Sequence, residues 1–256
     1  MIKLSEKFGK SFSKFLFPLL YKLFSFLKIN RRAINYLSEK GFFSNANQDF
    51  KILIQSLLNE KKIINILGNR LGSSSMYEPD PDLFDLHNIK KKDYQNYEIT
   101  KKVEVQCETL TESLKKLNIN SLDYLKVDTQ GSELEILKGI GDYRPLLIKI
   151  EMHVHSMYRN VPSWNELLEF LYKLNYIAID WKGIGSHATR VPAEIEMILI
   201  PNFNNEIGKK IINKNEKKFV CLMLIFGQIN LLKIISKKNM FRSFEKIKNF
   251  KDLYFN

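Results

Sequence analysis

The sequence predicts an α/β fold built on an open, mostly parallel sheet that ends in a hairpin. Two observations support this prediction. From Lys102 onward, short apolar strands alternate with amphipathic helices, and the last two strands are joined by a polar loop instead of a helix. Such alternation is typical of parallel sheets covered by helices. A chain of 256 residues suits one such domain with extensions at its ends.

Residues 1–62 are predicted to form a helical N-terminal segment. Residues 2–43 read as helical, with Gly41 as a stop signal, and residues 48–61 repeat apolar positions at three- and four-residue spacing. The stretch IINILGNRLGSSSMYEPDPD that follows is predicted to be a short strand and a polar loop. We expect the chain to stay irregular up to Thr100.

Residues 63–201 are predicted to form the α/β domain. The strand KKVEVQC alternates apolar and polar residues, and the helix after it begins with Thr109 and Glu112 at capping-box spacing. LDYLKVD is the next strand, and the helix SELEILKGI is closed by Gly139. The strand RPLLIKIEM leads to a helix with Ser163 as N-cap and Glu166 three residues later.

The strands YIAIDW and EIEMILIP, parted by the polar loop KGIGSHATRVPA, complete the sheet. Residues 202–256 are predicted to be a basic helical C-terminal extension. Its apolar run FVCLMLIFGQINLLKIISKK is interrupted by Gly227, Gln228, Asn230 and Lys233, so a helix packed on the domain is favoured over a membrane span.

The chain is basic, with a net charge of +12 from 40 Lys and Arg against 28 Asp and Glu, and much of the excess lies near the two ends. Nucleic acid, an anionic membrane surface or an acidic substrate would each fit, and so would the Lys-, Asn- and Ile-rich composition of an AT-biased genome. Because no aromatic-plus-basic stacking motif or basic reading helix is present, we expect no nucleic-acid partner. Peripheral membrane contact through the basic amphipathic ends stays open.

The cysteines and the N-terminus favour the cytoplasm. Cys107 and Cys221 lie far apart and form neither a metal spacing nor a disulfide framework. The N-terminal stretch SFSKFLFPLLYKLFSFLK is apolar, but Lys14, Pro18 and Lys22 interrupt it and no small-residue cleavage site follows, which argues against a signal peptide.

Ligands of open α/β sheets bind beyond the carboxyl ends of the strands. That rule selects Asp128, Thr129, Gln130, Glu151, Met152, His153 and Asp180, which end the predicted strands. An acid such as Asp128 can bind a metal, orient a substrate hydroxyl or amine, or accept its proton. The alternative is that Asp128 and Ser132 only cap the next helix, whose first turn Glu133 and Glu135 would decorate.

Glu151 ends the neighbouring strand, and the two histidines of EMHVH follow it. Two carboxylates at adjacent strand ends beside imidazoles could make a metal or an acid–base site. The metal signal is weak, because the spacing fixes no third ligand. A structural, hydrogen-bonded role for His153 stays open as the alternative, and the hydroxyl-rich SSSMYEP stretch is equally a plain surface turn.

The stretch LDYLKVDTQGSELEILKGI resembles the signature of the FkbM-type methyltransferases, a strand ending in Lys-x-Asp-x-Gln-Gly-x-Glu and then Leu-x-x-Leu-x-Gly. SSSMYEP is similar to the family's Ser-Ser-Leu-Tyr/Phe-x-Pro segment, and VEVQCETLTESL to its Val-x-Val-x-Thr-Leu-Asp-x-Leu segment. PLLIKIEMHVHSMY and SWNELLEFLYKLNYIAIDW resemble the elements that follow. The resemblance covers residues 71–201, about half of the chain.

The resemblance implies a Rossmann-like class I methyltransferase that uses S-adenosyl-L-methionine, in most members to methylate a hydroxyl of a sugar or secondary metabolite. The expected partner is therefore a small-molecule or glycan acceptor. Asp128, Glu151 and His153 are the candidate catalytic residues, with His153 as candidate base, and no metal is expected. Ser74, Ser75 and Gln130 are candidates for contact with the cofactor.

One part of the family's pattern is missing. Members carry an Asp-x-Gly-x-x-x-Gly strand and loop and then a strand ending in Glu-Pro, but this chain has no Gly-x-Gly before Gly72. We therefore expect a fold truncated in its first half, with impaired cofactor binding. The strand that ends at Asp128 would lie at or near an edge of the sheet, where residues 61–67 (KKIINIL) or another copy of the chain could pair with it.

Two functions follow from this pattern. The first is a methyltransferase in which positioning of the acceptor does most of the catalytic work. The alternative is a catalytically silent, truncated relative that binds without turnover or has no function.

Overall fold

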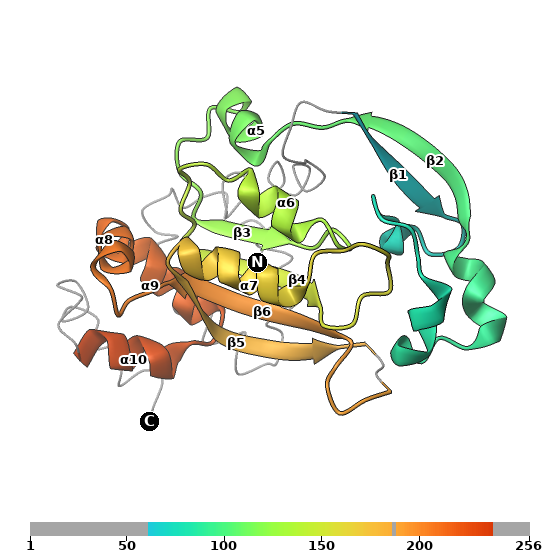
Figure 1. Cartoon of the computed structure of the whole chain (residues 1–256). Helices are drawn as coiled ribbons and strands as arrows, with labels where there is room; N and C mark the ends of the chain where they lie inside the picture. The colour runs from blue at the N-terminus through green and yellow to red at the C-terminus, as the bar shows by residue number, and fades with distance from the viewer. Residues whose placement is uncertain (1–60, 186–187, 238–256) are drawn as a thin grey trace, which may run out of the picture. The chain divides into compact units, whose positions relative to one another are not determined.

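The computed structural model describes residues 61–185 and 188–237 (Figure 1). Residues 61–219 belong to one compact unit, and residues 220–237 belong to a second. The predictions for residues 1–60 and 238–256 lie outside the described residues.

The larger unit holds a four-stranded sheet of β3 (Tyr124–Val127), β4 (Leu147–His153), β5 (Tyr176–Ile184) and β6 (Glu194–Pro201), in the order β3-β4-β6-β5. β3 and β4 are parallel, whereas β6 runs antiparallel to both β4 and β5. Three of the four strands therefore run in one direction, as predicted, and the β5–β6 hairpin is confirmed. The sequence did not show that β6 is inserted between β4 and β5.

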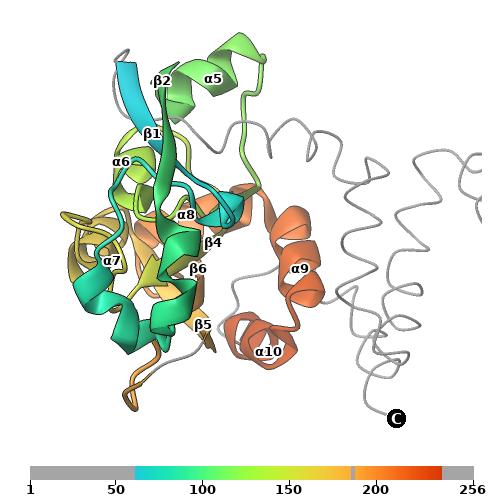
Figure 2. The same cartoon turned by 90° about the vertical axis from the view of Figure 1, so that its right-hand side faces the viewer.

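Helices α5 (Leu110–Lys116), α6 (Glu133–Lys138) and α7 (Trp164–Lys173) occupy the predicted positions. Figure 2 shows α6 and α7 on the same side of the sheet strands. Both predicted capping boxes are present, since the Thr109 and Ser163 side chains accept from the backbone of Glu112 and Glu166, whose carboxylates accept in return. These reciprocal bonds satisfy amides that the helix itself leaves without partners.

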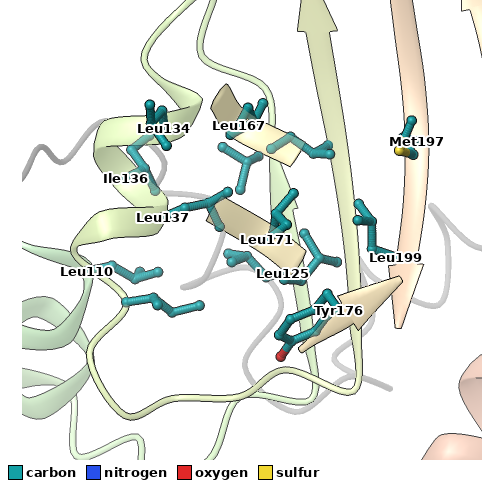
Figure 3. Close-up of a cluster of buried hydrophobic side chains, with 14 of the residues drawn as sticks. Leu110, Leu125, Leu134, Ile136, Leu137, Leu167, Leu171, Tyr176, Met197 and Leu199 are labelled. Atoms are coloured by element: carbon teal, nitrogen blue, oxygen red, sulfur yellow. The ribbon is translucent and has the colours of Figure 1, made fainter. Parts of the chain in front are cut away.

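The main hydrophobic core lies between these helices and one face of the sheet (Figure 3). The sheet contributes alternate residues, since side chains on a strand point to opposite faces. The buried core side chains of the sheet and of α6 and α7 are Leu125, Val127, Ile148, Ile150, Met152, Tyr176, Ile195, Met197 and Leu199, with Leu134, Ile136, Leu137, Leu167 and Leu171.

The predicted strand at 101–107 (KKVEVQC) is correct in type but wrong in placement. β1 (Lys61–Leu67) and β2 (Ile99–Gln106) form a separate antiparallel two-stranded ribbon. Every β2 side chain is exposed or only half-buried, so this strand cannot take an interior place in a sheet covered by helices. Residues 61–67 therefore pair with β2 and not, as one option had it, with β3, which is the first strand of its sheet.

The segment expected to stay irregular contains three 3₁₀ helices, η2 (Leu71–Ser73), η3 (Pro81–His87) and η4 (Lys91–Tyr97). Asp80 caps η3 through a bond from the amide of Asp82, and Pro81 fills the first helical position. These helices carry a second, smaller core, whose buried members are Leu67, Phe84, Tyr97, Met157 and Tyr158. This small core joins the polar loop to the segment that follows β4.

The C-terminal part is helical, as predicted, with α8 (Glu206–Lys214), α9 (Glu216–Ile225) and α10 (Ile229–Lys237). The long apolar run is divided at Gly227 into α9 and α10. Gly227 has a φ of +72°, a left-handed backbone conformation that glycine adopts readily. Among the described residues, no helix has the length and apolar character needed to span a membrane.

Candidate functional site

The turn after β3 is the most distorted backbone near the predicted site. Gln130 has a φ of +58° and Gly131 a φ of +112°. A Cβ on Gly131 would lie 2.8 Å from Val161 Cγ2 and 3.1 Å from Tyr77 Cδ2. The position thus needs glycine both for its backbone conformation and for its close contacts.

Glu133 holds this turn together, which the sequence did not reveal. Its carboxylate accepts from the Thr129 amide at 2.9 Å, the Thr129 hydroxyl at 3.1 Å and the Gly131 amide at 3.1 Å. The residue is only 4% exposed. Glu133 lies in the first turn of α6, as predicted, but it is buried there and binds the turn before the helix. Burial raises the pKa of Glu133, while these hydrogen bonds act in the opposite direction.

Neither predicted cap of α6 is present. Ser132 occupies the N-cap position, but its side chain makes no capping hydrogen bond. Asp128 is engaged elsewhere, because its Oδ2 accepts from Lys126 Nζ at 2.6 Å and its Oδ1 from Gln130 Nε2 at 3.5 Å. Asp128 is therefore held as a partly exposed, ion-paired carboxylate beside the turn.

Asp128, Glu151 and His153 share one face of the sheet, opposite the main core. In β4, Glu151 and His153 alternate with the core residues Ile150 and Met152. Since Val127 pairs with Ile150 in the parallel register, Asp128 follows β3 at the level of Glu151. The three predicted catalytic residues thus lie on neighbouring strands.

The carboxyl group of Glu151 is strongly perturbed. Burial, together with the nearby carboxylates of Asp128 and Glu194, raises the pKa of Glu151 to about 7, while Lys126 acts in the opposite direction. Asp128 and Glu151 therefore lie close enough to interact electrostatically.

His153 is buried and electrically neutral at pH 7. Burial lowers the pKa of His153 to about 4, with nearby His87 lowering it and Asp128 raising it. Its Nδ1 lies 3.4 Å from Glu194 Oε1 but makes no hydrogen bond there. The ring of Tyr158 packs edge-on against the imidazole, with 5.6 Å between ring centroids.

Glu194, the first residue of β6, is a member of the site that the sequence analysis missed. It lies directly across from His153 in the antiparallel β4–β6 register. Burial raises the pKa of Glu194, and Asp128 and Glu133 raise it further. No local signal marks Glu194, because its position depends on β6 pairing with β4.

The predicted cofactor-contact residues do meet, in a network of hydrogen bonds. Ser75 Oγ donates to the Gln130 carbonyl at 2.6 Å and accepts from the Tyr77 amide at 3.0 Å. Ser74 Oγ accepts from the Leu67 amide at 3.2 Å. The Tyr158 hydroxyl lies 2.7 Å from the carbonyl of Ser73 and 3.1 Å from Gln130 Oε1. The serine turn is thereby fastened to the turn after β3.

The strand-end rule also selected Met152, Thr129 and Asp180, but these residues either lie away from the site or bond to other residues. Met152 belongs to the main core, and both the amide and the hydroxyl of Thr129 bond to Glu133. Asp180 does not end its strand, because β5 continues to Ile184, and a bulge lies at Asp180. Its Oδ1 accepts from the Trp181 amide at 2.9 Å. The extra pairing with β6 extends β5 beyond the apolar run that the sequence shows.

Among the described residues, no cluster of three or more His, Cys, Asp or Glu side chains has an arrangement that could hold a metal ion.

Comparison with known proteins gives a single kind of match. No curated protein and no solved structure is significantly similar to the chain. The model of the methyltransferase FkbM domain matches residues 31–178, which is more than half of the chain. This match begins earlier and ends earlier than the resemblance over residues 71–201, and it includes the turn after β3 and both predicted catalytic carboxylates. The chain therefore belongs to the FkbM methyltransferase family.

Proposed function

We propose that this protein transfers a methyl group from S-adenosyl-L-methionine to a hydroxyl of a sugar or secondary metabolite, with Glu151 as the proton acceptor. The observation that carries this proposal is the placement of Asp128 beside Glu151 on neighbouring parallel strands. Family membership supports methyl transfer over the alternative of a silent relative.

Glu151 fits the role of base better than His153 does. A general base works best when its pKa lies near the working pH, and the pKa of Glu151 is raised to about 7. The pKa of about 4 makes His153 a weak proton acceptor. Asp128, fixed by Lys126 at 2.6 Å, is suited to orient the acceptor hydroxyl.

The acidic residues on the sheet face opposite the main core fit the sulfonium end of the cofactor. When bound, S-adenosyl-L-methionine supplies an electrophilic methyl group on a positively charged sulfur. The carboxylate of Asp128 raises the pKa of Glu151 and of Glu194, and Glu194 also raises the pKa of Glu151, which indicates an excess of negative charge that a cation would relieve. Gln130, Ser74 and Ser75 are proposed to hold the cofactor beside that charge.

The sheet supports a Rossmann-like fold that lacks its first half. β3, β4 and β5 run in the same direction, as in one half of a doubly wound sheet, and β3 is the first strand in the order. Because the sequence has no Gly-x-Gly before Gly72, we propose weaker cofactor binding than in an enzyme with a complete loop. Association of two copies through the edge of β3, peripheral membrane contact and a cytoplasmic location remain predictions.

Thermal unfolding with S-adenosyl-L-methionine or S-adenosyl-L-homocysteine tests the proposal. A ligand that binds only the folded state raises the melting temperature, and the charged sulfonium should raise it more than the uncharged thioether. The Glu151→Gln variant should keep most of this stabilisation and lose turnover. Equal stabilisation by the two compounds, or none with either, would contradict the proposed site. Calorimetry yielding a micromolar dissociation constant would contradict the weakened binding.

A further inference from the structure

The two-stranded ribbon of β1 and β2 has an open edge along β2. In the part of the chain that the structure describes, β1 is the single strand that pairs with β2. Figure 1 shows β1 on one side of β2 and no described strand on the other. An edge strand leaves a row of backbone donors and acceptors to which a further strand can be added.

The outward backbone groups of this edge belong to Lys102 and Glu104. On β1, Asn65 exchanges backbone hydrogen bonds with Ser75 at 2.8 and 3.3 Å, so its amide and carbonyl point away from β2. Asn65 lies opposite Lys102, and antiparallel strands alternate between bonded and non-bonded pairs. The backbone groups of Lys102 and Glu104 therefore point to the open edge, whereas those of Val103 point to β1.

The side chains of Lys102 and Glu104 carry opposite charges on one face of the ribbon. Each forms an ion pair within its own chain, Lys102 with Glu78 and Glu104 with Lys61, both at 2.7 Å. More than half of each of these side chains is exposed. Because exposed ion pairs contribute little to stability, both charges can take a new partner.

Pairing of β2 with β2 of a second copy is favoured in one register. Backbone bonding requires that Lys102 and Glu104 face residues whose groups also point outward, which places the two-fold axis at a residue and not between two residues. An axis at Lys102 or at Glu104 would put like charges opposite each other, which is destabilising. An axis at Val103 puts Lys102 of each copy opposite Glu104 of the other.

The other face of the ribbon is suited to the same register. Its side chains alternate with the charged ones, and Val103 and Val105 share this face with Ile64 and Ile66. All four are half-buried. With the axis at Val103, this residue meets its own copy, so the apolar strip continues from one ribbon to the next. The register thus combines backbone bonds, opposite charges and apolar contact.

We propose that two copies of this protein associate by antiparallel pairing of β2 with β2 about a two-fold axis at Val103, which joins the two ribbons into one sheet. The association is independent of methyl transfer, because no residue of the candidate site lies on β2.

Sedimentation equilibrium of the full-length protein over a range of concentrations tests the charge pairing. We expect the mass to rise from one chain to two. Glu104→Lys and Lys102→Glu change the net charge in opposite directions, yet each should weaken the association by about tenfold, since each puts like charges opposite each other on both sides of the axis. The double variant Lys102→Glu/Glu104→Lys exchanges the two charges and should restore the association. Melting curves show whether each variant is folded, and each single variant tests the pairing without the other.

A disulfide locates the axis. Cα atoms at a non-hydrogen-bonded antiparallel pair lie about 4.5 Å apart, within the range that a disulfide spans. In a Cys221→Ser background, which removes the exposed native thiol, Val103→Cys should give a covalent dimer with a mild oxidant. Val105→Cys is the matched control, because it shares the face of Val103 but lies opposite Lys101 of the second copy. This control should remain a single chain.

Each result either supports the β2 pairing or overturns it. Association that the double variant restores, with crosslinking at position 103 and not at position 105, supports it. A protein that stays a single chain at millimolar concentration overturns it. A dimer that both single variants leave unchanged forms through another surface, such as the edge of β3, and also overturns it. The same holds for a double variant that stays dissociated and for cysteine variants that crosslink equally or not at all.

Discussion

Replacement of Glu151 by Gln should remove a pH-dependent penalty on the stability of the fold. The pKa of Glu151 is raised from 4.5 in the unfolded chain to about 7 in the folded protein. The folded state therefore holds the proton more tightly. The stability from this group is fully present below about pH 4.5, falls as the pH rises to about 7, and is absent above it.

The size of the effect follows from the same two values. The difference between about 7 and 4.5, at about 1.4 kcal/mol per pH unit, gives an upper limit of about 3.4 kcal/mol. Glu151 is only half-buried, so solvent screening reduces this to about 1–2 kcal/mol. The Gln variant, which cannot ionise, should be more stable than the native protein by about that amount at pH 8.

Urea unfolding at pH 4.5, 6 and 8 measures this difference. The difference in the free energy of unfolding between Glu151→Gln and the native protein should increase as the pH rises. The control is Glu169→Gln on α7, because Glu169 is an exposed partner of Lys173, and its difference from the native protein should not change with pH. A gap that is the same at pH 4.5 and pH 8 would refute the account of Glu151.

Three further substitutions test the turn after β3 by chemical denaturation. Glu133→Gln should destabilise the fold by about 1–3 kcal/mol, since it removes the negative charge and replaces one of the two accepting oxygens by an NH2 group that can only donate, and no loss would show that Glu133 does not hold the turn. Gly131→Ala should cost about 2 kcal/mol or more, because its φ of +112° and the 2.8 Å approach of Val161 exclude a methyl group. Gly72→Ala is its control, with nothing within 4 Å, and equal losses at the two glycines would contradict this explanation. Tyr158→Phe should cost about 1 kcal/mol through the bonds to Ser73 and Gln130, and a neutral effect would mean that these bonds are replaced by water.

Local signals in the sequence predicted most of the elements correctly. The capping boxes at Thr109 and Ser163 fix where α5 and α7 begin, because the bonds involved span three residues. β6 has the bounds of its apolar run, Glu194–Pro201. Such features depend on side chains close in sequence to the backbone they satisfy, and no tertiary contact is needed to read them.

The pattern Lys-x-Asp-x-Gln-Gly-x-Glu was also sufficient to predict the family, and the strand-end rule selected both carboxylates of the candidate site. Asp128 follows a buried strand and Glu151 lies in the next one, so their proximity follows from parallel pairing alone. The pattern did not show what its last residue does. Glu133 turns back to bind the amides of Thr129 and Gly131, which only the three-dimensional path of the turn reveals.

Pairing between distant segments was decided by the tertiary structure. The alternating pattern of β2 is compatible with any partner, and only folding selects β1 and leaves it outside the main sheet. The insertion of β6 between β4 and β5 brings Glu194 opposite His153, 41 positions apart in the chain (194 minus 153). Charge and burial at that pair depend on which strands meet. The sequence alone therefore determined the elements and the family, while the tertiary structure decided which acids share one face of the sheet.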